Sequence, residues 1–201
     1  MPLSIRDVCE QELPQVLALN NAAGPSVLPL DRQRLAELFA TAPYFRVAEI
    51  DGHLAGFLIA LSAHTAYDGA NFRWFSGRYP DFVYIDRIVV AASYRRLGLG
   101  RIFYADVQSF AEVRSPLLAC EIFLEPRDDA AVLFHGTYGF CEVGQQQLAG
   151  RRVGMLVKEL CSYPWVRSQY LEAPAGGLPA QPWLAARSTR SVACAQLASH
   201  G

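Results

Sequence analysis

The sequence predicts an α/β (α+β) domain with a mixed, mostly antiparallel central sheet of six or seven strands and helices on both faces. Two observations predict this fold class. Two segments, near residues 45–61 and 141–158, have the pattern of β-hairpins. Between them, apolar β-branched runs alternate with amphipathic stretches in the order strand, helix, strand, helix.

The N-terminal elements are one strand and two helices. Residues 3–5 form a short strand, and Asp7 caps a helix to about residue 20 that Pro14 kinks or splits. After a Gly-Pro break, Asp31 begins a second helix, which runs through residue 42. Its apolar side chains recur at helical spacing, so this helix packs one face on the core.

The remaining elements follow from residue patterns along the chain. Residues 45–50 and 54–61 flank Asp51-Gly52-His53, which predicts a tight hairpin. After the long segment 63–82 we expect a strand at 84–90, a helix from Gly100 and a strand at 117–124. A helix over 128–138 and a hairpin formed by 141–147 and 152–158 complete the order.

The loop before the third predicted helix carries the motif Arg95-Arg-Leu-Gly-Leu-Gly100. Glycine lacks a Cβ, so backbone amides come close to a ligand, and the first N–H groups of a helix have no carbonyl partner. The helix dipole and the arginines add positive charge, which predicts a phosphate or pyrophosphate ligand. A P-loop is excluded because Arg101-Ile102 replaces its Lys-Ser/Thr pair, and the third glycine of a Rossmann fingerprint is absent.

Two motifs together resemble a known family. Arg95-x-x-Gly98-x-Gly100 after an apolar strand resembles the coenzyme A pyrophosphate loop of the GNAT superfamily of N-acyltransferases. Residues 128–140 are similar to its second signature, Asn-x-x-Ala-x-x-Leu-Tyr running into Gly-Phe, with Asp128, Ala131, Phe134 and His135 at the named places. The resemblance covers about residues 3–160. It implies a GNAT domain over residues 1–161 and leaves 162–201 as a Pro-, Ala- and Ser-rich tail.

The resemblance also implies an activity. The expected enzyme moves an acetyl group from acetyl-CoA to a primary amine of a small molecule or amino acid, by direct attack in a ternary complex. Three alternatives stay open: a coenzyme A-binding sensor or assembly domain without catalysis, a protein-amine acetyltransferase, and a binder of another nucleotide phosphate. Acetyl-CoA is the implied cosubstrate, and no metal is expected.

The expected cofactor site combines a strand end, a loop and a helix. In the family this strand splays from its neighbour, and its backbone groups bind the pantetheine arm and polarise the thioester carbonyl. The implied cofactor-binding residues are Ile88, Val89, Val90, Arg95, Arg96, Leu97, Gly98, Leu99, Gly100, Arg101, Asp128, Phe134 and His135.

A base is needed because an alkylamine with a pKa of ~10.4 is only about one part in two thousand neutral at pH 7. Asp86 is the first candidate, predicted to share a strand face with Tyr84 and Ile88. A structural pair with Arg87 is the alternative. Glu121 is the second candidate, because burial within an apolar strand would raise its pKa; the alternative is a solvated side chain.

The departing thiolate can take a proton from an acid. The family often uses a tyrosine for this step, where this sequence has His135. The donor is His135, Tyr138 one turn further on, or no residue, since a thiol with a pKa of ~8.5 is a tolerable leaving group. A packed, structural His135 is the alternative.

Composition limits the partners. The formal net charge is −1 without a long basic run, which argues against nucleic acid. No apolar run approaches the ~20 residues that span a bilayer, and the N-terminus lacks signal-peptide regions. Five scattered cysteines show neither zinc nor disulfide-framework spacing. We therefore expect a cytoplasmic protein without membrane contact, and a homodimer is left open.

Two segments carry further predictions. Residues 63–82 are too long for a hairpin turn and predict an acceptor site with aromatic walls, or alternatively a cover over the sheet or a dimer contact. Its aromatic and acidic residues are Tyr67, Asp68, Phe72, Trp74, Phe75, Tyr79 and Asp81. Beyond about residue 173 the composition predicts disorder. The alternative is that Trp165 and Trp183 bind the tail to a partner subunit.

Overall fold

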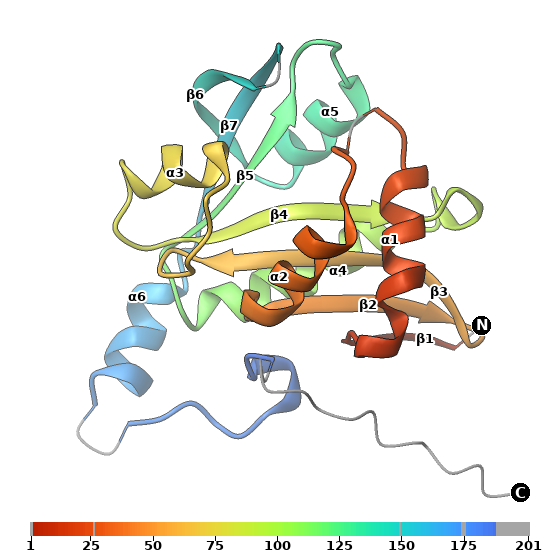
Figure 1. The fold of residues 1–201 in the computed structure, drawn as a ribbon. Helices are drawn as coiled ribbons and strands as arrows, with labels where there is room; N and C mark the ends of the chain where they lie inside the picture. The colour runs from red at the N-terminus through yellow and green to blue at the C-terminus, as the bar shows by residue number, and fades with distance from the viewer. Residues whose placement is uncertain (1, 26, 149, 174–175, 188–201) are drawn as a thin grey trace, which may run out of the picture.

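The computed structural model of the chain describes residues 2–25, 27–148, 150–173 and 176–187. At its centre is a seven-stranded sheet in the order β1-β2-β3-β4-β5-β7-β6. Only β4 and β5 pair in parallel among these neighbours; the other pairs are antiparallel. This confirms the predicted mixed sheet with helices on both faces (Figure 1).

The strands are β1 (Leu3–Asp7), β2 (Tyr44–Ile50), β3 (His53–Ser62), β4 (Val83–Val90), β5 (Leu117–Phe123), β6 (Cys141–Leu148) and β7 (Arg151–Glu159). The α-helices are α1 (Leu13–Ala22), α2 (Arg32–Thr41), α3 (Ala70–Ser76), α4 (Leu99–Glu112), α5 (Asp129–Thr137) and α6 (Tyr163–Val166). Shorter helical turns are η1 (Glu10–Glu12), η2 (Ala92–Tyr94), η3 (Arg167–Leu171) and η4 (Pro182–Leu184).

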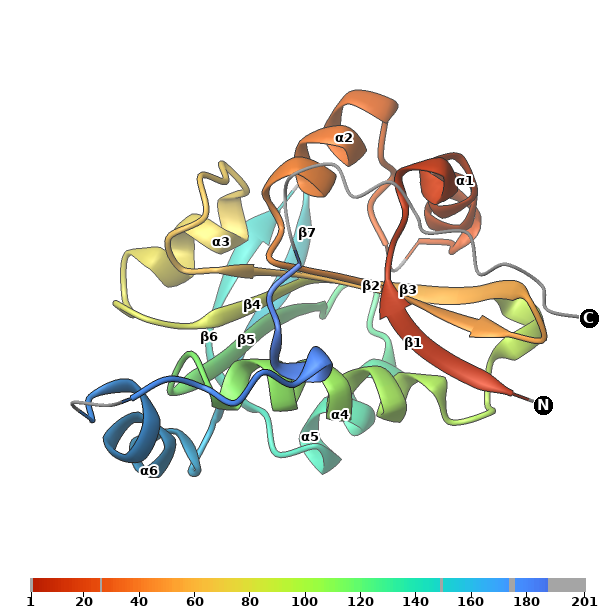
Figure 2. The same ribbon diagram turned by 90° about the horizontal axis from the view of Figure 1, so that it is seen from below.

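The sheet separates two apolar layers. Helices α1, α2 and α3 lie on one face, and α4 and α5 lie on the other (Figure 2). Alternation along β3 sends Phe57 and Ile59 to the first layer and Leu58 to the second. Phe103 and Val107 of α4 fill the second layer at the predicted helical spacing. Burial on both faces holds β4 and β5 rigidly at the centre of the sheet.

The β2–β3 hairpin confirms its prediction. Asp51 and Gly52 both have positive φ, 51° and 77°, as a two-residue type I′ turn requires. Asp31 also caps α2 as expected, because its carboxylate accepts the Arg34 N–H at 2.7 Å.

Two predicted segments differ in the structure. Asp7 does not cap the first helix, because β1 continues through it; α1 begins at Leu13 with Pro14 in its first turn, where proline removes no helical hydrogen bond. The segment 63–82 is not a plain loop, since it contains α3. Two of its aromatic residues, Phe72 and Phe75, are buried in the core.

The tail also differs from its prediction in the part described. Residues 183–187 make hydrogen bonds to the domain, although composition predicted disorder there. The Arg187 N–H donates to the Pro43 carbonyl at 2.8 Å, and Arg114, just after the end of α4, donates to the Leu184 carbonyl. Trp183 is 52% exposed, and residues 188–201 lie outside the described residues.

The cysteine spacing predicted no disulfide framework, but the described cysteines are in two states. Cys120, Cys141 and Cys161 carry free thiols, whereas Cys9 is disulfide-bonded. Among the described residues, no set of three or more His, Cys, Asp or Glu side chains is placed to hold a metal ion. No helix in that part of the chain has the length and apolar character needed to cross a bilayer. The cytoplasmic location stays a prediction.

Candidate active site

The site lies where two central strands part. β4 and β5 pair only at Val83–Leu118 and Tyr84–Ala119. Beyond Tyr84 the two strands diverge, so the edge of β4 that faces β5 has backbone groups without a strand partner. Parallel strands with both faces covered normally continue to pair, and the early separation opens a space inside the sheet.

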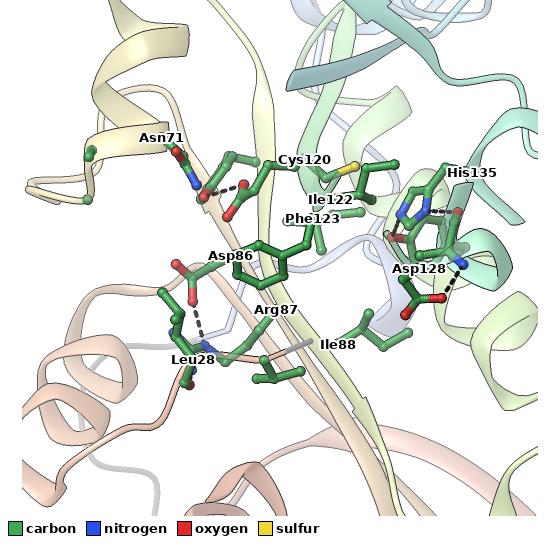
Figure 3. A pocket seen from close by; sticks show the side chains of 18 of the residues that line it. Leu28, Asn71, Asp86, Arg87, Ile88, Cys120, Ile122, Phe123, Asp128 and His135 are labelled. Carbon is green, nitrogen blue, oxygen red and sulfur yellow. Dashed lines mark hydrogen bonds and ion pairs between the residues drawn. The ribbon is translucent and has the colours of Figure 1, made fainter. Parts of the chain in front are cut away.

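A cavity of about 380 Å³ occupies this opening. Its walls come from β4, β5, α3, α4 and α5 and from the segments before α2 and α3 (Figure 3). Asp86 lies on one side of it and His135 on the other, with Ile122 and Phe123 between them. The cavity therefore joins a polar end near α3 to an end that is covered by α5.

The glycine motif forms the turn into α4. Gly98 has φ 83° and Arg96 has φ 66°. These two left-handed residues of the six-residue motif turn the backbone sharply into the helix. A Cβ built on Gly98 meets nothing within 4 Å, which leaves open space above the first turn. The Gly98 carbonyl accepts the Arg101 N–H at 3.0 Å and the Ile102 N–H at 3.2 Å, and the N–H groups that precede these in the first turn have no acceptor within the helix, as an anion site requires.

The arginines of the motif differ in direction. The Arg95 guanidinium turns back to the carbonyls of Val90 and Ala23, at 3.3 and 3.2 Å. Arg96 and Arg101 are exposed beside the loop, and Leu97 is 56% exposed. Leu99 is buried in the second apolar layer and fixes the start of the helix. The charge beside the loop therefore comes from Arg96 and Arg101 more than from Arg95.

Asp86 lies on a β-bulge, which the sequence did not indicate. Ile59 pairs with Arg87 and Ala60 pairs with Ile85, so Asp86 has no partner on β3. The extra residue reverses the alternation of side chains beyond it. Ile88 consequently packs in the layer opposite to Tyr84, and the expectation that Asp86 shares one face with both is wrong.

The Asp86 carboxylate is fully engaged. The Tyr67 hydroxyl donates to one oxygen at 2.5 Å, and Arg87 Nε donates to the other at 2.7 Å. Arg87 Nη1 also donates to the Asn20 amide oxygen at 2.9 Å and to the Leu28 carbonyl at 3.2 Å. The Asp86 and Arg87 side chains are 4% and 11% exposed. This geometry matches the structural pair considered for Asp86.

Glu121 differs from Asp86 because no arginine or lysine in the described part of the chain forms an ion pair with it. It is half-buried in the cavity wall, and the Tyr84 hydroxyl donates to it at 2.7 Å. Burial raises the pKa of Glu121 to about 7, although hydrogen bonds from Asn71 and Tyr84 oppose this rise. A carboxylate with a pKa near neutrality can accept and release a proton at physiological pH.

His135 lies at the other end of the cavity, with both ring nitrogens occupied. Nδ1 lies 2.7 Å from the Ala131 carbonyl, to which it can only donate. Nε2 therefore accepts the Tyr104 hydroxyl proton, at 2.6 Å. Burial lowers the pKa of His135, which keeps the imidazole neutral. The geometry thus favours the packed, structural role for this histidine.

The other residues of the second motif are partly separated from the cavity. Asp128 lines it and caps α5 by accepting the Ala131 N–H at 3.0 Å. Phe134 packs on Tyr104 and lies 3.7 Å from the position of a Cβ on Gly100. The Tyr138 hydroxyl donates to the Arg101 carbonyl at 3.0 Å, away from the cavity lining. Tyr138 therefore joins α5 to α4.

Sequence reasoning missed three cavity residues: Asn71, Tyr104 and Cys120. Tyr104 was hidden in the apolar stripe of α4, and Cys120 in an apolar strand. Asn71 stands in α3, which was predicted as loop. The available signal was the spacing of Phe72 and Phe75 directly after Asn71, which is a helical spacing. Of the aromatic residues predicted to form the acceptor wall, Tyr67 lines the cavity together with Tyr84.

Comparisons with known proteins agree with this geometry. Residues 13–140, well over half of the chain, match the family described as Acetyltransferase (GNAT) family. No curated protein matches the chain significantly.

Solved structures share the fold at low sequence identity. The ribosomal-protein-S18-alanine N-acetyltransferase from Escherichia coli has a TM-score of 0.61 and 16% identity, covering 79% of this chain and 94% of that one. Naa50 from Arabidopsis thaliana, in complex with a bisubstrate analogue, has a TM-score of 0.61 and 18% identity, covering 79% and 99%. The yncA protein from Salmonella typhimurium, solved with acetyl-CoA, has a TM-score of 0.59 and 17% identity, covering 80% and 95%.

Proposed function

This chain belongs to the GNAT family of acetyltransferases, and we propose that it moves an acetyl group from acetyl-CoA to a primary amine of a small molecule or amino acid. The amine attacks directly, within a ternary complex. The observation that carries this proposal is the separation of β4 from β5 after Tyr84, which creates a cavity inside the sheet with Glu121 in its wall.

The chain's own residues fit acetyl-CoA as the cosubstrate. The open space above Gly98 and the free first-turn amides of α4 suit its diphosphate, with Arg96 and Arg101 beside them. At Ile88, Val89 and Val90, β4 pairs with β3 but has no strand partner on the β5 side, and this edge suits an extended amide chain through added backbone hydrogen bonds. Bound there, acetyl-CoA would supply the thioester carbon that the amine attacks.

Glu121 is the proposed base, in preference to Asp86. It takes a proton from the acceptor ammonium, which leaves a lone pair on nitrogen. The nitrogen then bonds to the thioester carbon and gives up its second proton to solvent, the C–S bond breaks, and the thiolate leaves with the electron pair. Hydrogen-bond donors on the open edge of β4 stabilise the carbonyl oxygen as it gains charge. Asp86 is less suited because Tyr67 and Arg87 occupy both of its oxygens.

No acid is assigned to the departing thiolate. His135 has no proton on Nε2 while it accepts from Tyr104, and Tyr138 points to the Arg101 carbonyl. A thiol with a pKa of ~8.5 leaves without an acid and then takes a proton from solvent. His135 and Tyr138 accordingly hold the packing of α5 on α4.

Thiol release from acetyl-CoA with a panel of primary amines tests the activity. The wild-type rate should rise with pH up to about 7, since the base works in its ionised form. Glu121→Gln should lower turnover by about 10²- to 10⁴-fold, the range for general-base catalysis, and should remove that ionisation. Glu10→Gln, at an exposed position, is the matched control.

Binding of coenzyme A without thiol release for any amine would favour the second candidate, a sensor without catalysis. Heat of binding with ATP or NAD, and none with coenzyme A, would reject both. Equal loss of turnover in Glu121→Gln and Glu10→Gln would remove Glu121 from the mechanism.

A further inference from the structure

The acceptor end of the cavity has an unusual balance of charge. The lining carries the carboxylates Asp86 and Glu121 at this end and Asp128 at the α5 end, and Arg87 is its one guanidinium among the described residues. The imidazole of His135 adds no positive charge, because burial and its two hydrogen bonds keep it neutral. The lining as a whole is therefore negative when its carboxylates are ionised.

The single cation is not available to a ligand. Arg87 donates Nε to Asp86 and Nη1 to Asn20 and Leu28, so its side chain is held between β4 and α1. The ion pair is almost fully buried, with 4% and 11% of the two side chains exposed. Rupture of such a pair leaves a buried charge without a partner, which costs far more than the pair itself contributes.

The rest of the acceptor end is apolar or aromatic. Val27 and Leu28 come from the segment before α2, Ile122 and Phe123 from β5, and Tyr67 from the segment before α3. The Tyr67 hydroxyl is already committed to Asp86, so its ring is the part that a ligand meets. These walls suit the hydrocarbon or ring portion of an acceptor.

We propose that the acceptors of this site are primary amines with an apolar or aromatic body and no carboxylate next to the amine. The proposal rests on the proposed acetyl transfer and narrows its substrate class. An ammonium approaches Glu121, which has no cationic partner, and gains from the negative lining. A free amino acid brings a carboxylate that faces the ionised Glu121, while Arg87 stays bound to Asp86 and offers no compensating cation.

Three acceptors that share the same phenethyl group test this proposal on the intact chain: phenethylamine, phenylalanine amide and phenylalanine. The amine of phenethylamine is more basic than that of phenylalanine, and the amine of the amide is less basic. Basicity alone therefore places phenylalanine between the other two. We expect kcat/KM for phenethylamine and for phenylalanine amide, which carry no carboxylate, to exceed that for phenylalanine by at least about tenfold.

A second arm changes the charge balance. Asp86→Asn frees Arg87 from its ion pair, so phenylalanine should gain at least about tenfold in kcat/KM relative to phenethylamine. Asp68→Asn is the matched control, because Asp68 is an exposed carboxylate that pairs with Arg34 outside the cavity lining. The ratio in that variant should equal the wild-type ratio.

Three results would count against these assignments. Phenylalanine equal to or better than the other two acceptors in the wild-type protein would overturn the proposal. Loss of turnover with all three in Asp86→Asn would make Asp86 the base and overturn its pairing role. Absence of thiol release with every amine tried, these three included, would instead reject the proposed acetyl transfer.

Discussion

Glu121→Gln should change the stability of the protein in a manner that depends on pH. Burial is the main cause that raises the pKa of Glu121 from 4.5 to about 7. The folded state therefore binds this proton more tightly than the unfolded state does. Ionisation of Glu121 stabilises the unfolded chain relative to the fold, and glutamine has no such ionisation.

The sign and size follow from linkage. Below pH 4.5 the carboxyl is protonated in both states, and its contribution to stability is fully present. That contribution is lost as the pH rises through about 7. At ~1.4 kcal/mol for each pH unit, the loss between 4.5 and 7 is roughly 3 kcal/mol. Relative to the wild type, the free energy of unfolding of the glutamine variant should therefore rise by roughly 3 kcal/mol between pH 4.5 and pH 8.

Thermal unfolding followed by circular dichroism at these two pH values measures the effect. For a domain of this size ~1 kcal/mol moves Tm by about 2–4 °C, so the difference between the two proteins should change by roughly 6–12 °C. The Tyr84 hydroxyl still finds an acceptor in glutamine, which limits other losses. Glu10→Gln, an exposed carboxylate, should differ from wild type by less than about 0.5 kcal/mol at both values.

A difference between variant and wild type that is the same at pH 4.5 and pH 8 would refute this reasoning. It would mean that water reaches the carboxylate as freely in the folded as in the unfolded chain. Glu121 would then have an ordinary carboxylate pKa, and its advantage over Asp86 as a base near pH 7 would disappear. A stability that rises more steeply with pH in the wild type than in the variant would refute it equally.

Three more predictions concern the glycine turn, His135 and the hydrogen bonds behind Glu121. Gly98→Ala should weaken coenzyme A binding, measured by calorimetry, at least about tenfold. The control Gly150→Ala, where glycine has φ 74° and equally open space, should lose the same ~1–2 kcal/mol of stability to backbone strain but keep the wild-type affinity for coenzyme A. His135→Phe should lower the free energy of unfolding by about 1–3 kcal/mol, because a buried tyrosine hydroxyl loses its acceptor; a hundredfold loss of turnover at unchanged stability would restore the acid role. Gln146 donates to the Asn71 amide oxygen, and Asn71 in turn donates to Glu121. Gln146→Glu should turn the Asn71 amide, remove its hydrogen bond to Glu121 and raise the pH midpoint of turnover by about one unit. Gln147→Glu, one residue along the strand, should leave that midpoint unchanged. Equal midpoints in the last two variants would contradict this chain of hydrogen bonds.

Local patterns predicted the elements whose stability is local. The β2–β3 hairpin depends on two positive-φ residues in sequence, and α2 depends on its capping aspartate. The turn at Gly98 likewise needs a residue without a Cβ, which the sequence states directly. These features involve neighbours along the chain, so their physical cause is visible in the residue order.

The first helix and α3 were less well predicted, because contacts with distant parts of the chain decide where they form. Strand pairing of β1 with β2 extends through Asp7, a non-local effect that overrides its tendency to cap a helix. Helix α3 has seven residues and is marginal by itself. It forms because Phe72 and Phe75 pack beneath it on the sheet.

The sequence by itself indicated most of the order of strands and helices, the family and the glycine turn at Arg95–Gly100, because each is encoded in residues close together along the chain. The tertiary structure alone decided which carboxylate of the cavity wall is suited to the proposed role of base. A bulge at residue 86 and a guanidinium held by α1 neutralise Asp86, while separation of β4 from β5 leaves Glu121 half-buried and without a cation. The physical reason is that a carboxylate's proton affinity depends on the charges and solvent around it, and these come from segments far apart in sequence.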